Sequence, residues 1–194
     1  MNKGDNISSH LKNSHVLTLN EARAMGVNPM QITRAIKAGK LHRLCEAVYT
    51  DDLDLPFDPI KKYLSVTAKY PYAVIASISA LRFHNLTDEE ERDIWIALPH
   101  SKKIQGNSGV KVLRLSGRAY SMGIEIQKVG KREIKFYDRE KSVVDAFKYL
   151  TEEIAIKALK AYLKQPSVDI PKLLDYSKKL GKPLQNEVKT IMTV

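Results

Sequence analysis

The chain has 194 residues, of which 43% are hydrophobic and 28% are charged, a composition typical of globular rather than disordered proteins. Its one cysteine, Cys45, excludes a disulfide framework and a thiolate-rich zinc site, because both need several sulfur atoms. The formal net charge of +10 favours a polyanionic partner such as nucleic acid.

The sequence also bears on where the protein works. The first fifteen residues lack the apolar core of a secretory signal peptide. No run of the chain approaches the roughly 20 apolar residues that a membrane-spanning helix needs. We therefore expect a soluble, cytoplasmic protein.

The charge is distributed unevenly along the chain. Residues 1–50 carry seven basic and three acidic residues, whereas residues 51–58 contain four aspartates and no base. Residues 59–194 then carry 25 basic and 15 acidic residues. The charge reversal coincides with Pro56 and Pro59, which bias their predecessors away from helix. Together these features predict a domain border near residue 55, with domains at 1–55 and 56–194.

The first domain is predicted to hold three short helices followed by a pair of strands. A helix is expected over residues 5–13. Thr18 and Glu21 have the spacing of a capping box, which predicts a second helix that Gly26 ends. A third helix is expected over residues 29–38, after Asn28 as its N-cap and with Pro29 in its first turn. Residues 41–50 then have the composition of a strand pair.

The second domain is predicted to mix helices and strands, which makes the whole chain an α+β protein with a helical C-terminal tail. The Gly130-Lys131 pair predicts the turn of a hairpin. We expect helices over residues 58–69, 77–84, 138–149, 152–164, 169–180 and 183–192, and strands over 72–76, 93–98, 110–115, 124–129 and 133–137.

The second and third helices have the lengths of a helix-turn-helix, and the strand pair after them would be its wing. The stretch from Pro29 to Arg43 contains four bases and no acid. In the major groove Gln reads adenine, Arg reads guanine and Lys contacts phosphates, while a wing reaches a flanking phosphate or the minor groove. A solvated basic helix without a ligand is the alternative. The residues predicted to bind DNA are Gln31, Thr33, Arg34, Lys37, Lys40, His42 and Arg43.

A second basic region follows in the C-terminal domain. Residues 94–124 contain five bases and no acid, and further bases come soon after. Strand alternation can place several of them on one face, which predicts a patch for RNA, DNA or an acidic protein surface. The alternative is that they only solvate the strands. The predicted patch consists of Lys102, Lys103, Lys111, Arg114, Arg118, Lys128, Lys131, Arg132 and Lys135.

Catalytic and metal-binding patterns are scarce. The sequence has no glycine-rich phosphate loop, and its five histidines do not cluster, so we expect no metal, no cofactor and no enzymatic activity. The exception is Glu133-Ile134-Lys135 with Asp93, a set that Mg²⁺-dependent nucleases use. A nuclease therefore stays open as an alternative.

Asp145 is unusual because it lies among apolar residues of a predicted helix. An acid in that position either pairs with a nearby base or serves a functional site. We favour a structural pair with Arg139 or Lys141.

Several blocks of the sequence resemble the AbiEi family of AbiE-type antitoxins. The string LTLNEARAMGVNPMQITRAIKAGKLHRLCEAVYT resembles the family's N-terminal winged-helix module. Ala47 stands where the family wing often has Gly, and Glu46 stands where a base is expected. The further blocks that resemble the family are residues 74–86, 93–99, 113–125 and 136–145.

The resemblance implies an antitoxin of a type IV toxin–antitoxin system, which serves phage defence through abortive infection. Such a protein represses its own operon, because its winged helix binds inverted repeats in promoter DNA. Its C-terminal domain counters a nucleotidyltransferase-like toxin without a stable complex. The alternative is a winged-helix transcriptional regulator whose second domain senses a ligand or a protein.

Overall fold

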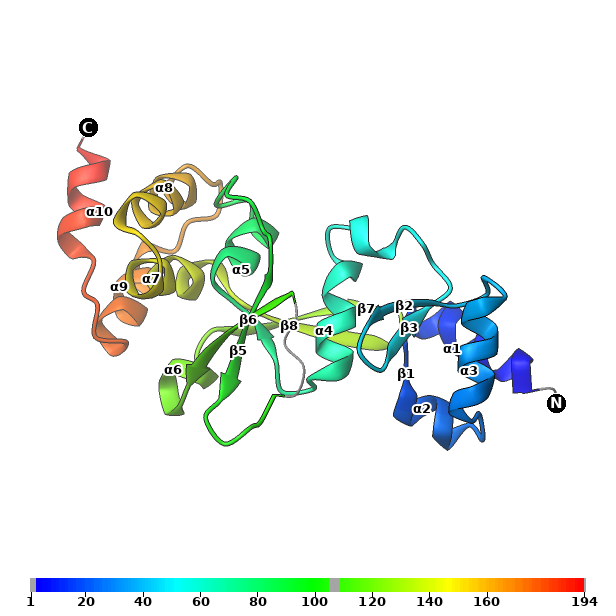
Figure 1. Cartoon of the computed structure of the whole chain (residues 1–194). Coiled ribbons are helices and arrows are strands. Elements are labelled where there is room, and N and C mark those ends of the chain that lie inside the picture. The colour runs from blue at the N-terminus through cyan, green and yellow to red at the C-terminus, as the bar shows by residue number, and fades with distance from the viewer. Residues whose placement is uncertain (1–2, 105–108, 194) are drawn as a thin grey trace. The chain divides into compact units, whose positions relative to one another are not determined.

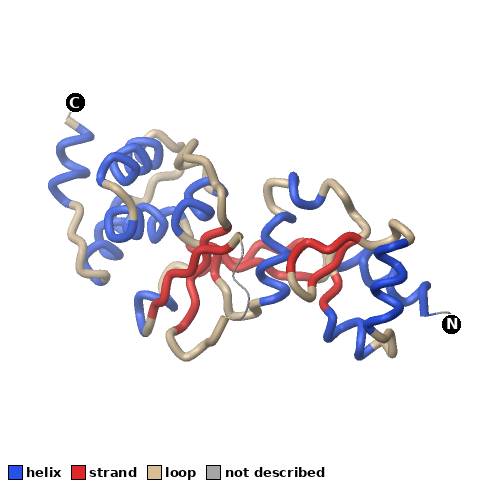
Figure 2. The backbone as a smooth tube through the Cα atoms, viewed as in Figure 1, coloured by secondary structure: helices blue, strands red, loops and turns tan. Residues whose placement is uncertain are grey.

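The computed structural model describes residues 3–104 and 109–193, and its helices and strands confirm the predicted α+β class. The chain forms two compact units (Figures 1 and 2). The first consists of Met1–Ala73 with Ile126–Ile134, and the second of Val74–Glu125 with Lys135–Val194. No helix in the described part of the chain combines the length and hydrophobicity needed to cross a membrane.

The first unit contains the three helices and the strand pair that the sequence predicts. Both predicted N-caps are present, because the side chains of Thr18 and Asn28 accept hydrogen bonds from backbone N–H groups three residues later. The elements are α1 (Lys3–Ser14), β1 (Leu17–Thr18), α2 (Leu19–Ala24), α3 (Pro29–Lys37), β2 (His42–Cys45), β3 (Val48–Thr50), η1 (Leu55–Phe57), η2 (Lys61–Tyr63) and α4 (Leu64–Lys69).

The three strands form an antiparallel sheet in the order β1-β3-β2. Tyr49 of β3 lies opposite Leu17 on one side and Arg43 on the other. The register then shifts so that Cys45 lies opposite Val48, which leaves a two-residue turn at the tip. The helices pack on a core made of Leu11, Leu17, Ala22, Val27, Ile32 and Leu41.

The acidic segment, residues 51–58, lies within the first unit and does not separate it from the second. This position differs from the domain border predicted near residue 55. Leu55 is only 1% exposed, and α4 beyond it packs against all three strands of the first unit. The helix expected from residue 58 is replaced by η2 and the shorter α4. A charge reversal reports on solvent-facing side chains, so it could not reveal that Leu55, Tyr63 and Leu64 are buried.

The other sheet is mixed, in the order β6-β5-β4-β8-β7, and all of it lies in the second unit except Ile126–Ile134 of the β7–β8 hairpin, which belongs to the first. β4 is antiparallel to β5 and parallel to β8, while β5 and β6 are parallel. The elements from residue 74 onward include one short helix, α6, that was not predicted from the sequence. In chain order these elements are β4 (Val74–Ile75), α5 (Ser77–Phe83), β5 (Ile94–Pro99), β6 (Val110–Leu115), α6 (Gly117–Ser121), β7 (Ile124–Val129), β8 (Arg132–Tyr137), α7 (Arg139–Tyr149), α8 (Glu152–Leu163), α9 (Ile170–Lys179) and α10 (Gln185–Met192).

The last four helices form the helical tail predicted for this unit (Figure 1). α7 contacts α5, α8 and α9, and α8 contacts α10. Their shared core includes Val143, Leu159 and Tyr162, each fully buried. Asp145 and Lys141 of α7 are 1% and 0% exposed and form an ion pair with each other. The structural pair expected for Asp145 is therefore confirmed, with Lys141 as its partner.

Candidate nucleic-acid interface

The outer face of α3 carries the bases predicted to bind DNA. Ile32 turns inward and is 2% exposed, while Arg34 and Lys37 are exposed. Lys40, just past the helix, is exposed as well. Within residues 3–104 and 109–193 no carboxylate forms an ion pair with any of these three bases. Their charge is therefore available to an anion in solution.

Two other residues predicted for this face have partners within the helix. The Oε1 atom of Gln31 accepts a hydrogen bond from the backbone N–H of Asn28 at 2.9 Å, as part of a capping box. The hydroxyl of Thr33 donates to the carbonyl of Pro29 at 3.0 Å. Gln31 therefore uses its acceptor to begin the helix, which leaves its Nε2 group for a base. The spacing of Asn28 and Gln31 already contained this signal.

The strands β2 and β3, which are expected from the sequence to be a wing, form a hairpin closed by a two-residue turn. Arg43 is exposed and His42 is half-buried, so Arg43 is the better placed of the two to reach a ligand. The Nε–H group of Arg43 donates to the carbonyl of Cys45 at 3.3 Å. Ala47 has a φ of 62°, the left-handed region that favours glycine. A glycine at this position would adopt the same conformation without the steric cost of a Cβ atom.

Glu46, at the tip of the same turn, is held by Lys69 of α4. Their charged groups lie 3.0 Å apart. This hydrogen bond and the charge of Lys69 lower the pKa of Glu46 below its ordinary value. The charge of Glu46, which stands where the AbiEi family is expected to have a base, is thus balanced by Lys69.

The tip of the β7–β8 hairpin belongs to the first unit and is fixed to its helices. The Nη2 atom of Arg132 donates to both carboxylate oxygens of Glu21 at 2.8 Å and to the carbonyl of Val16 at 2.9 Å. Its Nε atom donates to the carbonyl of Ser14 at 3.2 Å. The backbone N–H of Lys131 donates to the carbonyl of Asn13 at 2.7 Å.

Glu21 joins this contact to the N-terminus of α2. Its carboxylate also accepts a hydrogen bond from the backbone N–H of Thr18 at 2.8 Å. Burial raises the pKa of Glu21, but the hydrogen bonds from Thr18 and the charge of Arg132 outweigh burial and lower it overall. Arg132, predicted to belong to a ligand-binding patch, therefore acts as a structural residue of the first unit.

The predicted second basic patch is divided between the two units. Lys128, Lys131 and Arg132 belong to the first unit, and the other six residues belong to the second. Some of those six also have local partners. Arg114 donates to the carbonyls of Pro99 and Lys102, and the Nζ atom of Lys111 lies 5.0 Å from the centre of the Trp95 ring.

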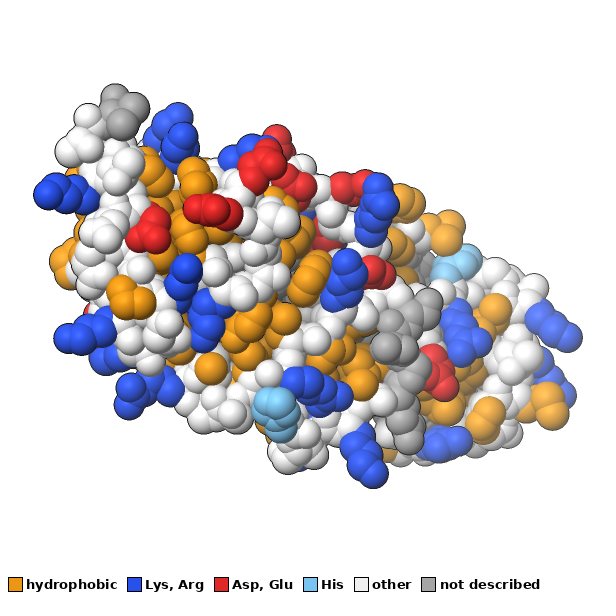
Figure 3. Space-filling view, turned by 60° about the vertical axis from the view of Figure 1, so that its left-hand side comes forward, with side chains coloured by type: hydrophobic (Ala, Val, Ile, Leu, Met, Phe, Trp, Pro, Cys, Tyr) orange, Lys and Arg blue, Asp and Glu red, His pale blue; other side chains and the backbone are white. Residues whose placement is uncertain are grey.

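Because the two units do not follow the chain order, their net charges differ from those counted along the sequence. Residues 1–73 with 126–134 contain 13 Lys and Arg against 8 Asp and Glu, a balance of +5. The remaining residues contain 19 against 14, also +5. On the face seen in Figure 3, Lys and Arg are scattered among apolar and uncharged side chains. The excess charge is thus shared evenly, and the first unit gains part of its share from the hairpin.

A buried polar cluster in the second unit was not foreseen from the sequence. The Nζ atom of Lys172 on α9 lies 3.0 Å from Asp138 and 2.8 Å from Glu140. The hydroxyl of Tyr162 donates to Glu140 at 2.8 Å. Burial lowers the pKa of Lys172, but its hydrogen bonds to the two carboxylates outweigh burial and raise it. Because every charged group here has a partner, the cluster attaches α9 to the start of α7.

The residues of the nuclease alternative lie in different units. Glu133 is exposed in the first unit, whereas Asp93 and Lys135 are half-buried in the second. In the part of the chain that the structure describes, no group of three or more His, Cys, Asp or Glu residues could hold a metal ion.

Comparison of the chain with protein-family models and with curated proteins finds no match. The resemblance to AbiE-type antitoxins therefore depends on the sequence blocks themselves. The site with the most direct chemical interpretation is the exposed basic face of α3.

Proposed function

We propose that the chain is a DNA-binding transcriptional repressor whose first unit is a winged helix-turn-helix. The observation that carries this proposal is the face of α3, where Arg34 and Lys37 are exposed and have no carboxylate partner among the described residues. An α-helix with its side chains is about 10 to 12 Å across, which fits the major groove of B-DNA, about 12 Å wide.

The elements around α3 support the same function. α2 precedes α3 after a short turn, and the hairpin of β2 and β3 follows it, which is the order of a winged helix-turn-helix. Arg43 on the wing supplies a further exposed base for a phosphate or the minor groove. Lys69 counters Glu46 at the wing tip, so this carboxylate repels a phosphate less than an unpaired one would.

We propose further that the protein is the antitoxin of an AbiE-type pair. This step depends on the resemblance of its sequence blocks to that family. The first unit would bind inverted repeats in its own promoter, and the second would counter a nucleotidyltransferase-like toxin without forming a stable complex with it. The protein would work in the cytoplasm, where both promoter DNA and toxin are found.

DNA binding is tested with the double variant Arg34→Ala and Lys37→Ala on DNA from upstream of the protein's own gene. The logarithm of the binding constant falls with the logarithm of the salt concentration, and each lost phosphate contact reduces the steepness of this slope by about 0.9. The double variant should therefore reduce it by up to about 1.8 and weaken binding several-fold or more. Lys178→Ala with Lys179→Ala is the matched control, since both lysines are exposed on α9 of the second unit. Unchanged affinity and slope in the first double variant would show that α3 is not the recognition helix.

Antitoxin activity is tested by co-expression with the nucleotidyltransferase-like toxin that we propose is encoded in the same operon. The full chain should restore growth, and so should the Arg34→Ala and Lys37→Ala variant, if the second unit counters the toxin. The full chain is needed because a cut near residue 55 would remove α4 from the first unit. Failure of the wild-type chain to restore growth would contradict the antitoxin assignment and leave DNA binding to its own test.

A further inference from the structure

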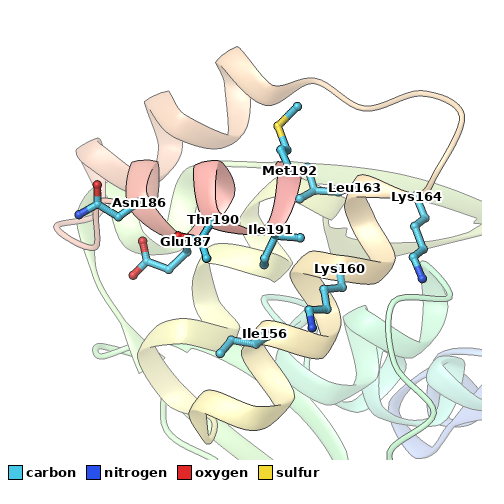
Figure 4. Close-up of a pocket in the computed structure, with 9 residues that line it drawn as sticks. All are labelled: Ile156, Lys160, Leu163, Lys164, Asn186, Glu187, Thr190, Ile191 and Met192. Carbon is cyan, nitrogen blue, oxygen red and sulfur yellow. The ribbon is translucent and has the colours of Figure 1, made fainter. Parts of the chain in front are cut away.

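The second unit has an open groove between α8 and α10 that no part of the proposed function uses. Its volume is about 750 Å³. Apolar side chains from both helices line it, among them Ile156 and Leu163 of α8 and Ile191 and Met192 of α10 (Figure 4). Met192 is 61% exposed.

α8 is apolar on more than the side that faces the core. Ala155, Leu159 and Tyr162 are fully buried on its inner side. Ile156 and Leu163 lie roughly 100° further round the helix and line the groove, and Leu163 also packs against the edge of that core. A helix packed against one core needs only one apolar stripe, so this second stripe is suited to a further contact.

The groove also has a charge pattern. Lys160 and Lys164 are exposed on the α8 side, one helical turn apart, and line the groove, while the α10 side carries one half-buried acid, Glu187. No carboxylate among the described residues forms an ion pair with either lysine. Like charges at this spacing repel each other, and anionic groups one turn apart on a partner would remove that repulsion.

We propose that this groove binds one face of an amphipathic α-helix from another protein, with acidic residues beside its apolar stripe. The apolar residues would contact Ile156, Leu163 and Ile191, as helices do in other hydrophobic grooves. Acidic residues one turn apart would pair with Lys160 and Lys164. A second copy of the chain fits less well, because each unit carries +5 and would repel its copy.

The experiment uses the full chain and three synthetic peptides of about 16 residues, or more than four helical turns. The first has leucines at helical spacing flanked by glutamates. The second has the same composition with the stripe scrambled, and the third has lysines in place of the glutamates. Fluorescence anisotropy gives the affinities, and NMR chemical shifts of the labelled protein locate the site. We expect only the first peptide to bind, with shifts at Ile156 and Ile191.

Charge reversal provides the decisive comparison. Lys160→Glu with Lys164→Glu should weaken binding of the first peptide by at least about tenfold. Lys178→Glu with Lys179→Glu changes the net charge equally, outside the groove lining, and should leave binding unchanged. Equal binding of all three peptides, shifts elsewhere, no effect of the groove variant, or a dimer that the groove variant dissociates would each overturn the proposal.

Discussion

Replacing Arg132 by alanine should destabilise the first unit, although residue 132 lies far along the chain from the helices it contacts. The substitution removes two hydrogen bonds to the Glu21 carboxylate and two to backbone carbonyls. Hydrogen bonds to charged groups contribute more than neutral ones, but the Glu21 side chain is 34% exposed and water screens it. We therefore expect a loss of about 3 kcal/mol in the free energy of unfolding.

Urea unfolding measures this loss. With a slope typical of small domains, about 3 kcal/mol moves the midpoint of the first unit's transition by about 1 to 3 M. Far-UV circular dichroism follows the helices of both units, while the fluorescence of Trp95, the one tryptophan, follows the second. Lys131→Ala is the matched control, because Lys131 is exposed and contacts the helices through its backbone.

The pH dependence gives an independent check on the ionic part of this contact. Because the folded-state pKa of Glu21 is lowered, its contribution is complete above the unfolded-state pKa and is lost as the pH falls through the folded-state pKa. Glu21→Gln should therefore lose less stability than the wild-type chain between neutral pH and the acid range. If Arg132→Ala shifted the midpoint no more than Lys131→Ala, the hairpin contact would not stabilise the unit as argued.

Three further substitutions test single features of the structure by the same urea assay. Ala47→Gly should stabilise the first unit by about 1 kcal/mol, because φ is 62° there; a loss of stability would show that the wing turn is not strained. Gly130→Ala should cost at least about 2 kcal/mol, since its Cβ would lie 2.1 Å from the carbonyl oxygen of Asn13, and an effect below about 0.5 kcal/mol would contradict that approach. Asp145→Ala should cost about 3 to 5 kcal/mol because it leaves Lys141 buried and unpaired, and adding Lys141→Met should recover part of that loss.

Features set by neighbouring residues could be predicted from the sequence. The capping box of Thr18 and Glu21 correctly predicted the start of α2, because its partners are three residues apart. Asp145 was correctly expected to pair with a nearby base, since Lys141 lies one helical turn before it.

Features set by distant contacts could not be predicted in this way. Glu21 and Arg132 are 111 residues apart, and nothing in either local pattern indicates that they meet. For the same reason Arg132 was assigned to a basic patch, when its guanidinium is used inside the first unit. The border near residue 55 failed similarly, because charge and proline content describe a surface loop and do not reveal that Leu55 is buried.

The hairpin also determines how the two proposed activities can be separated. Residues 126–134 complete the first unit, so a fragment that ends at residue 55 or 73 lacks the hydrogen bonds from Arg132 and Lys131. Conversely, the same strand β8 pairs with β4 in the sheet of the second unit through Phe136 and Ile75. Truncation would therefore disturb both units, whereas substitutions on the exposed face of α3 remove proposed DNA contacts and leave this shared strand intact.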